Sequence, residues 1–559
     1  MKHLTTVLTA CLPALLGLAG CAAPRSEAAF YEGFGNYTRR ISTASPEAQR
    51  WFDQGMQLLY GYNHDEAIRS FERAAELDPA CAIAHWGIAY ANGFHINNTE
   101  MTPEQSRAAF EAAQAALAAL AAPGDGATPA ERALVEAVAE RYAWPEPEDR
   151  GHLDLAYADA MGAAWRAHPE DADIGALYAE SLMDLQPWDL WTKDGQPKGR
   201  TEEIVEALET TLRMRPDHPG ANHFYIHTVE ASPDPARAVA AADRLVDLVP
   251  GAGHLVHMPS HIYTRVGRYA DAADANARAI AVDEAYFALA PEPDFYSLYY
   301  IHNVHFLAYA AMMEGRYAAA MSAARKLEAD VPADFLRAYV AFADGLMATP
   351  LHVMIRFGRW DKILTEPEPP GFRLLSRAQW HYARGVAYSA LGRTDQARGE
   401  LAAFEALAAE VPEDWKVGNN ASGDVLSLCR GMLRGELLFR EGKRDEAFAL
   451  LRDAAREEDA LVYDEPPGWM QPVRHALGAL LMSCERYAEA EEVYAEDLDR
   501  NAENGWSLLG MELSLRAQGA PEDAAAYAAR RAAAWRRADV QPASSCYCEP
   551  GAQAVAGVR

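Results

Sequence analysis

Small and apolar residues recur along the chain in groups separated by three or four positions. Residues 48–81 carry the clearest set, at positions 4, 8, 11, 20, 24, 27 and 32 of that segment: Trp51, Gly55, Leu58, Ala67, Phe71, Ala74 and Pro79. Intervals of this kind are typical of helix faces, and Gly or Ala at positions 8 and 20 permits a close approach of two helices. The pattern predicts an α-helical chain built from a repeated unit.

Further copies keep the same phase. They begin at residues 219, 253 and 301 and near residues 378, 428 and 471, and a degenerate helix pair starts around Trp506. Segments containing Pro or Gly interrupt the pattern at residues 121–128, 188–200, 290–296 and 365–371. The chain is therefore expected to be one long array of repeats with insertions.

These marker positions resemble the signature of the tetratricopeptide repeat (TPR) family. The resemblance implies an all-α superhelical solenoid in which each repeat is an antiparallel pair of helices, A and B, that buries its apolar face by stacking on its neighbours. The Pro-rich run at residues 366–370 suggests two sub-arrays. We expect a first array at 46–365, a break at 366–375, a second array at 376–540 and a disordered tail at 541–559.

The tail contains Cys546 and Cys548, one residue apart. The two cysteines could bind a metal, pair with another cysteine, or belong to an unstructured tail. The unstructured tail is the reading that the sequence favours.

The start of the chain has the pattern of an export signal. Lys2 and His3 precede an apolar stretch at residues 4–18, and Leu18-Ala19-Gly20-Cys21 resembles the lipobox of bacterial lipoproteins. The resemblance implies a signal peptide at 1–20, lipidation of Cys21 and a polar tether at 21–45. It places the protein in the cell envelope, attached to the outer membrane and facing the periplasm. A plain secretory signal with a chance cysteine is the alternative.

Charge and hydropathy narrow the possible partners. The formal net charge of −30 argues against a nucleic-acid partner, because phosphate binding requires patches of Lys and Arg. No run of eighteen apolar residues follows the start, so only the lipid would hold the protein at a membrane.

Histidines are concentrated in one part of the chain. Seven of the 17 lie between residues 223 and 305. Together with one glutamate they form the candidate site: His223, His227, Glu230, His254, His257, His261, His302 and His305. In repeat numbering they occupy positions 2, 5, 9 and 12, which share one face of three successive A helices, away from the packing positions. In TPR proteins this face lines the concave groove where ligands bind.

Such a cluster is suited to a transition metal ion, because imidazoles three or four residues apart lie on adjacent turns and neighbouring helices can converge on one ion. Zinc, copper and iron all accept imidazole ligands. Glu230 could ligate, orient an imidazole, or act as a base on metal-bound water. The alternatives are a scaffold that binds a protein or peptide in the groove without metal, and a metal-dependent hydrolase or oxidase that uses Glu230. The chain has no recognised catalytic motif, which favours binding over catalysis.

Neighbouring residues are weaker candidates. Glu180 and Asp184 face the same groove by approximate phase, and they could add carboxylates to the site or simply be solvated. His95 is placed to approach the groove from one end. Aromatic residues at 187–191 and 296–300 either cap the groove or pack their own loops.

Overall fold

The computed structural model describes residues 28–124, 126–290 and 295–550. The predicted signal peptide and lipidated Cys21 lie outside these residues, so both stay predictions. Within the described residues, no helix has the length and apolar character needed to cross a membrane.

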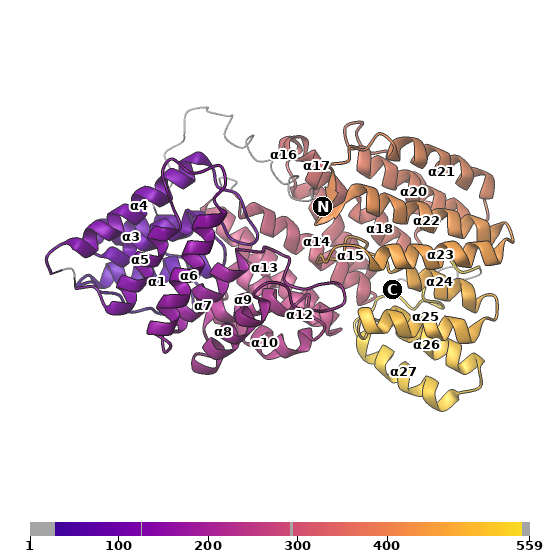
Figure 1. The fold of residues 1–559 in the computed structure, drawn as a ribbon. Helices are drawn as coiled ribbons and strands as arrows, with labels where there is room; N and C mark the ends of the chain where they lie inside the picture. The colour runs from indigo at the N-terminus through magenta and orange to yellow at the C-terminus, as the bar shows by residue number, and fades with distance from the viewer. Residues whose placement is uncertain (1–27, 125, 291–294, 551–559) are drawn as a thin grey trace. The chain divides into compact units, whose positions relative to one another are not determined.

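The described chain is built almost entirely of helices (Figure 1). The first helices are α1 (Pro46–Tyr60), α2 (His64–Leu77), α3 (Ala82–Ala91), α4 (Pro103–Ala121), α5 (Pro129–Glu140), α6 (Gly151–Ala167), α7 (Ala172–Met183), α8 (Thr201–Met214), α9 (Pro219–Val229), α10 (Val239–Leu248), α11 (Gly253–His257), α12 (Pro259–Arg265) and α13 (Tyr269–Leu289). Those that follow are α14 (Ser297–Met313), α15 (Tyr317–Asp330), α16 (Ala333–Ala338), α17 (Val340–Ala343), α18 (Thr349–Arg356), α19 (Trp360–Thr365), α20 (Leu374–Ala390), α21 (Thr394–Ala408), α22 (Ser422–Arg440), α23 (Arg444–Asp459), α24 (Val473–Met482), α25 (Tyr487–Arg500), α26 (Gly505–Ala517) and α27 (Pro521–Ala534). Two short 3₁₀ helices, η1 (Pro235–Ala238) and η2 (Asp344–Ala348), and a small hairpin of β1 (Lys416–Val417) and β2 (Asn420–Ala421) complete the elements.

The predicted all-α helix-pair architecture is confirmed. Consecutive helices pack on each other as α1 on α2, α20 on α21, α22 on α23 and α26 on α27. Small residues recur at the same positions of successive repeats, and the first repeat shows the steric reason. A Cβ on Gly55 or on Gly87 would lie 2.5 Å from the ring of Phe71, so the ring of one B helix fits between the backbones of two A helices.

The described chain forms two compact units. The N-terminal unit comprises the described part of Leu12–Ile262 together with Arg278–Tyr300, and the C-terminal unit comprises Tyr263–Ala277 with the described part of Ile301–Arg559. Residues 366–375, where the sequence suggested a boundary, lie inside the C-terminal unit. The Pro-rich run is instead the loop between α19 and α20.

Residues 28–45 differ from the polar tether that the sequence suggested. Arg39 is 8% exposed and donates to the carboxylates of Asp171 and Asp173, at 2.8 Å each. Further along, Ile41 is buried and the Ser42 hydroxyl donates to Glu131. This segment packs against α5 and α7 because its polar side chains are matched by carboxylates there.

Residues 541–550 also differ from the expected disordered tail. The segment has no helix, yet Ser544, Ser545, Tyr547 and Cys548 are buried. Cys546 and Cys548 form a disulfide with each other. Residues 551–559 lie outside the described part of the chain.

Candidate metal centre

Two helices of the N-terminal unit supply the central histidines. Helix α9 carries His223 and His227, and α11 carries His254. The start of α9 is fixed by Pro219 in its first turn and by His218, whose Nδ1 accepts the backbone N–H of Ala221. Because every residue of α9 is buried, its two histidines project into the interior of the unit.

Three imidazoles meet at one point. Each of His223, His227 and His254 places one ring nitrogen within 4.8 Å of the other two, and we call these residues the histidine trio. The Nε2 atoms of His223 and His254 are 3.2 Å apart. The exposed fractions of the three residues are 0%, 5% and 2%. The trio therefore brings three imidazole nitrogens, each a possible metal ligand, close together in a place that solvent does not reach.

Hydrogen bonds on the far side of two rings decide which nitrogen faces the centre. His223 donates from Nδ1 to the carbonyl oxygen of Tyr60 at 2.7 Å, which satisfies a carbonyl in the last turn of α1. His227 donates from Nδ1 to Glu230 Oε1 at 3.0 Å. Both protons on Nδ1 leave the Nε2 lone pairs available, which is the arrangement seen around metal-binding histidines. His227 Nε2 and His254 Nδ1 have no hydrogen-bond partner although both are buried.

Glu230 connects the trio to a second pair of histidines in the same unit. Its Oε2 lies 2.6 Å from His261 Nδ1, and the Nε2 of His261 lies 2.8 Å from the Nε2 of His257. Burial alone would raise the pKa of Glu230, but His261 and His227 lower it to about 2. Glu230 is thus a buried carboxylate with both oxygens engaged, in a position to orient imidazoles rather than to accept a further proton.

The trio is uncharged near neutral pH. Burial lowers the pKa of all three imidazoles, and neighbouring histidines lower those of His223 and His254 further, because a second positive charge would be repelled. Neutral imidazole is the form that binds a metal ion.

Aromatic side chains cover the histidines. Tyr62 stacks on His95 with ring centroids 4.1 Å apart and lies 4.6 Å from the ring of His223. Tyr299 lies 4.2 Å from His254, and Trp188 meets His227 edge-on at 5.3 Å. His95 therefore lies beside the histidines, as expected, and of the two alternatives left open for the aromatic segments, Trp188 and Tyr299 contact the trio.

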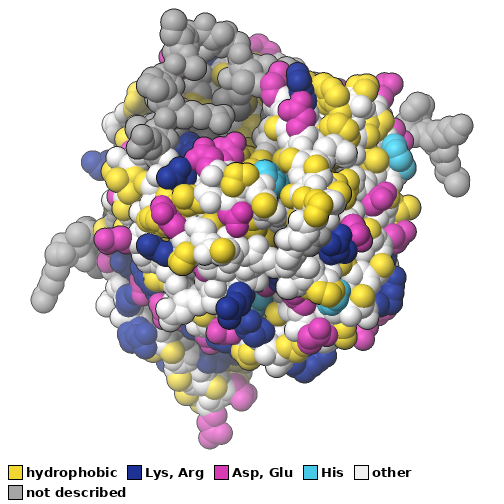
Figure 2. Space-filling view, turned by 90° about the vertical axis from the view of Figure 1, so that its left-hand side faces the viewer, with side chains coloured by type: hydrophobic (Ala, Val, Ile, Leu, Met, Phe, Trp, Pro, Cys, Tyr) yellow, Lys and Arg dark blue, Asp and Glu magenta, His cyan; other side chains and the backbone are white. Residues whose placement is uncertain are grey.

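The expected open groove is not what surrounds these residues. His223, His227, Glu230, His254, His257 and His261 are all at most 5% exposed, whereas the phase argument placed them on a ligand-accessible face. On the face of the molecule drawn in Figure 2, histidine side chains appear only as isolated patches. Aromatic residues from two turns and from α14 cover the trio: Tyr62, Trp188 and Tyr299.

Two of the predicted residues belong to the other unit. His302 and His305 lie on the part of α14 that is assigned to the C-terminal unit. His302 is half-buried and edge-on to Phe306, and burial and the neighbouring His352 lower the pKa of His305 to about 4.

Glu180 and Asp184 are neither solvated nor ligands of the trio. Asp184 pairs with the buried Arg141 at 2.7 Å, and Tyr90 donates to Glu180. Burial raises the pKa of both carboxyls. Sequence reasoning missed Arg141, the Tyr60 carbonyl and Tyr62, since none of them belongs to a recognisable motif.

Together these observations define an all-α helical-repeat protein with a buried histidine cluster. No protein-family model and no curated protein matches the chain. Among solved structures, the human IFIT1 dimer with m7Gppp-AAAA aligns with 88% of this chain and 95% of its own, at 13% identity and a TM-score of 0.30. Yeast Tom70 aligns with 86% and 96%, at 13% identity and a TM-score of 0.28. At these identities and TM-scores, the similarity gives no information about the function of this chain.

Proposed function

We propose that the N-terminal unit binds a transition metal ion through His223, His227 and His254. One observation carries the proposal: three buried, neutral imidazoles converge within 4.8 Å, and two of them are held by Nδ1–H hydrogen bonds that direct Nε2 inward. Burying such nitrogens without partners is costly, and a bound cation would offset that cost.

The donor set is compatible with zinc, copper or iron, the metals that accept imidazole nitrogen. When bound, such an ion supplies a Lewis acid at this position. Glu230 has each oxygen within 3.0 Å of a histidine Nδ1, which supports an orienting role for it and makes metal handling a better proposal than hydrolysis or oxidation with Glu230 as base.

The proposal extends to location. The lipobox-like Leu18-Ala19-Gly20-Cys21 supports a lipid anchor that holds the protein in the cell envelope, at the outer membrane and facing the periplasm. Fractionation of wild type and Cys21→Ser tests this: the variant should move from the membrane to the soluble fraction. An unchanged membrane fraction would argue against lipidation of Cys21.

Elemental analysis of the purified full chain tests the metal site. Wild type should contain zinc, copper or iron, or take one up at neutral pH, and His227→Ala should lose it. His152→Ala is the matched control, because His152 is an exposed histidine on α6 of the same unit. A wild-type protein that stays metal-free after incubation with each ion would overturn the proposal.

A further inference from the structure

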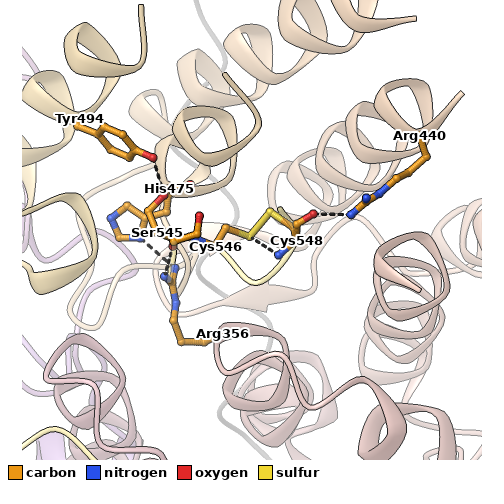
Figure 3. The surroundings of a disulfide bond; sticks show 8 residues. Arg356, Arg440, His475, Tyr494, Ser545, Cys546 and Cys548 are labelled. Atoms are coloured by element: carbon orange, nitrogen blue, oxygen red, sulfur yellow. Dashed lines mark hydrogen bonds between the residues drawn. A yellow bond between two sulfur atoms is a disulfide. The ribbon is translucent and has the colours of Figure 1, made fainter. Parts of the chain in front are cut away.

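The segment that follows α27 is held in the C-terminal unit by specific contacts along its length (Figure 3). Residues 541–550, the C-terminal segment, have no regular secondary structure. Ser545 and Cys548 are each 1% exposed and Tyr547 is 8% exposed. An irregular peptide this well buried needs a surface that satisfies its backbone and side chains.

Residues of the helical array form hydrogen bonds with both the backbone and the side chains of the segment. The Ser545 hydroxyl donates to the carbonyl of His475 at 2.8 Å and hydrogen-bonds to the Tyr494 hydroxyl at 2.7 Å. Arg356 donates to the carbonyl of Ser545, and Arg440 donates to the carbonyl of Cys548. Two guanidinium groups thus donate to backbone carbonyls of the segment. The Ser545 hydroxyl is bound by the Tyr494 hydroxyl and by the backbone carbonyl of His475.

An aromatic position completes the pattern. The Tyr547 ring lies edge-on to Trp506 at 6.3 Å, and its Cβ occupies the space beside Gly358. A Cβ on Gly358 would approach Tyr547 Cβ to 2.7 Å, and Gly358 has φ of +61°, a conformation that side chains disfavour. The absence of a side chain at Gly358 therefore leaves the space that Tyr547 occupies.

The surface is organised by the helical array rather than by the segment. Arg356 donates to Nδ1 of His475 at 3.0 Å, and His475 in turn donates from Nε2 to Asp497 at 2.8 Å. Asp497 also accepts from Ser507 and Asn504 at the start of α26. Arg356 and His475, which both contact the segment, are therefore held by residues outside it, which is the usual property of a preformed binding surface.

We propose that this surface, defined by Arg356, Arg440, His475, Tyr494 and Trp506, is a peptide-binding site that the C-terminal segment occupies in cis. Its partner is a protein segment that adopts the same irregular, turn-containing backbone and presents a serine two residues before an aromatic residue, as Ser545 and Tyr547 do. Donation by the two arginines to peptide carbonyls supplies affinity that does not depend on side-chain identity, and the hydroxyl and aromatic positions supply selectivity. The site lies in the C-terminal unit and does not depend on metal binding.

The test uses the full chain and a fluorescent peptide with the sequence of residues 541–550, its disulfide closed. The double variant Ser545→Ala, Tyr547→Ala weakens the cis occupant and should bind this peptide at least about tenfold more tightly than wild type does. The control variant changes Gln541 and Pro550, two exposed positions of the same segment, to alanine and should behave as wild type. Peptide carrying the same two alanines should not bind.

Limited proteolysis of the segment decides the remaining outcomes. In the double variant the segment should be cut faster than in wild type, and excess peptide added to wild type should accelerate cutting there, a readout that needs no variant to fold. A released segment without peptide binding would overturn the proposal. So would a segment that stays protected in the double variant, since these two side chains would then not hold it.

Discussion

Replacing Glu230 with glutamine tests how the proposed metal centre is held together. One carboxylate oxygen accepts the Nδ1–H of His227 at 3.0 Å, and the other lies 2.6 Å from Nδ1 of His261. Glutamine keeps the size and shape of the side chain but has only one acceptor oxygen, and its amide nitrogen is a donor. One histidine N–H would then face another donor inside a site that water does not reach.

Where the affected imidazole is His227, it has two ways to relieve this conflict, and both damage the site. His227 can move its proton from Nδ1 to Nε2, which removes the lone pair that faces the centre, or it can rotate away. Loss of partners that orient metal-binding histidines typically weakens metal affinity about 10- to 100-fold, which corresponds to about 1.4–2.7 kcal/mol. A buried donor without a partner adds a folding cost of about 1–3 kcal/mol.

Competition with a chelator of known affinity measures the zinc dissociation constant at neutral pH for wild type and Glu230→Gln. Glu206→Gln, on an exposed position of α8, is the matched control and should equal wild type. Circular dichroism should show unchanged helix content in both variants. If Glu230→Gln binds zinc as tightly as Glu206→Gln does, the orienting role assigned to this carboxylate is incorrect.

Three further predictions follow from the described contacts. Zinc bound to wild type should raise the melting temperature, and His227→Ala should lose that gain while His152→Ala keeps it, as thermal unfolding with and without chelator will show. Because burial lowers the pKa of the trio, zinc binding should persist as pH falls below about 6.5, the ordinary imidazole value, and decline only at lower pH; a midpoint at or above 6.5 in a pH titration would contradict this. Asp173→Asn breaks the buried ion pair with Arg39 and should lower the free energy of unfolding by about 3–5 kcal/mol in a denaturant titration, whereas Asp217→Asn, at an exposed position, should leave it unchanged within about 0.5 kcal/mol.

The sequence pattern was sufficient to predict the repeats and the face that the histidines share. The helix pair α1 and α2 coincides with the repeat at 48–81, and the repeat at 219–252 coincides with α9 and α10. Phase alone brings His223, His227 and Glu230 to one side of α9. Periodicity determines on which side of its own helix a side chain lies. For His223 and His227 this side agrees with the prediction.

Periodicity could not reveal what covers that face. Tyr62 lies in the turn after α1, with φ of +54°, and its position over the histidines depends on that turn. Irregular segments such as 28–45 and 541–550 have no hydrophobic periodicity, so the sequence did not predict that they pack against the helices. Their anchors, Arg39 and Ser545 among them, find partners far away in the sequence, and one chain alone contains no signal for such pairs.

The nearly complete burial of the trio has a kinetic consequence. An ion cannot reach or leave His223, His227 and His254 by diffusion through solvent, because the three side chains are 0–5% exposed beneath Tyr62, Trp188 and Tyr299. Exchange has to wait for local opening of the segments that carry these three residues, so its rate is set by the free energy of that opening rather than by collision with a chelator. An ion held there would have a long residence time even at moderate affinity. Slow exchange of that kind would suit a site that keeps its ion for long periods and would not suit rapid delivery.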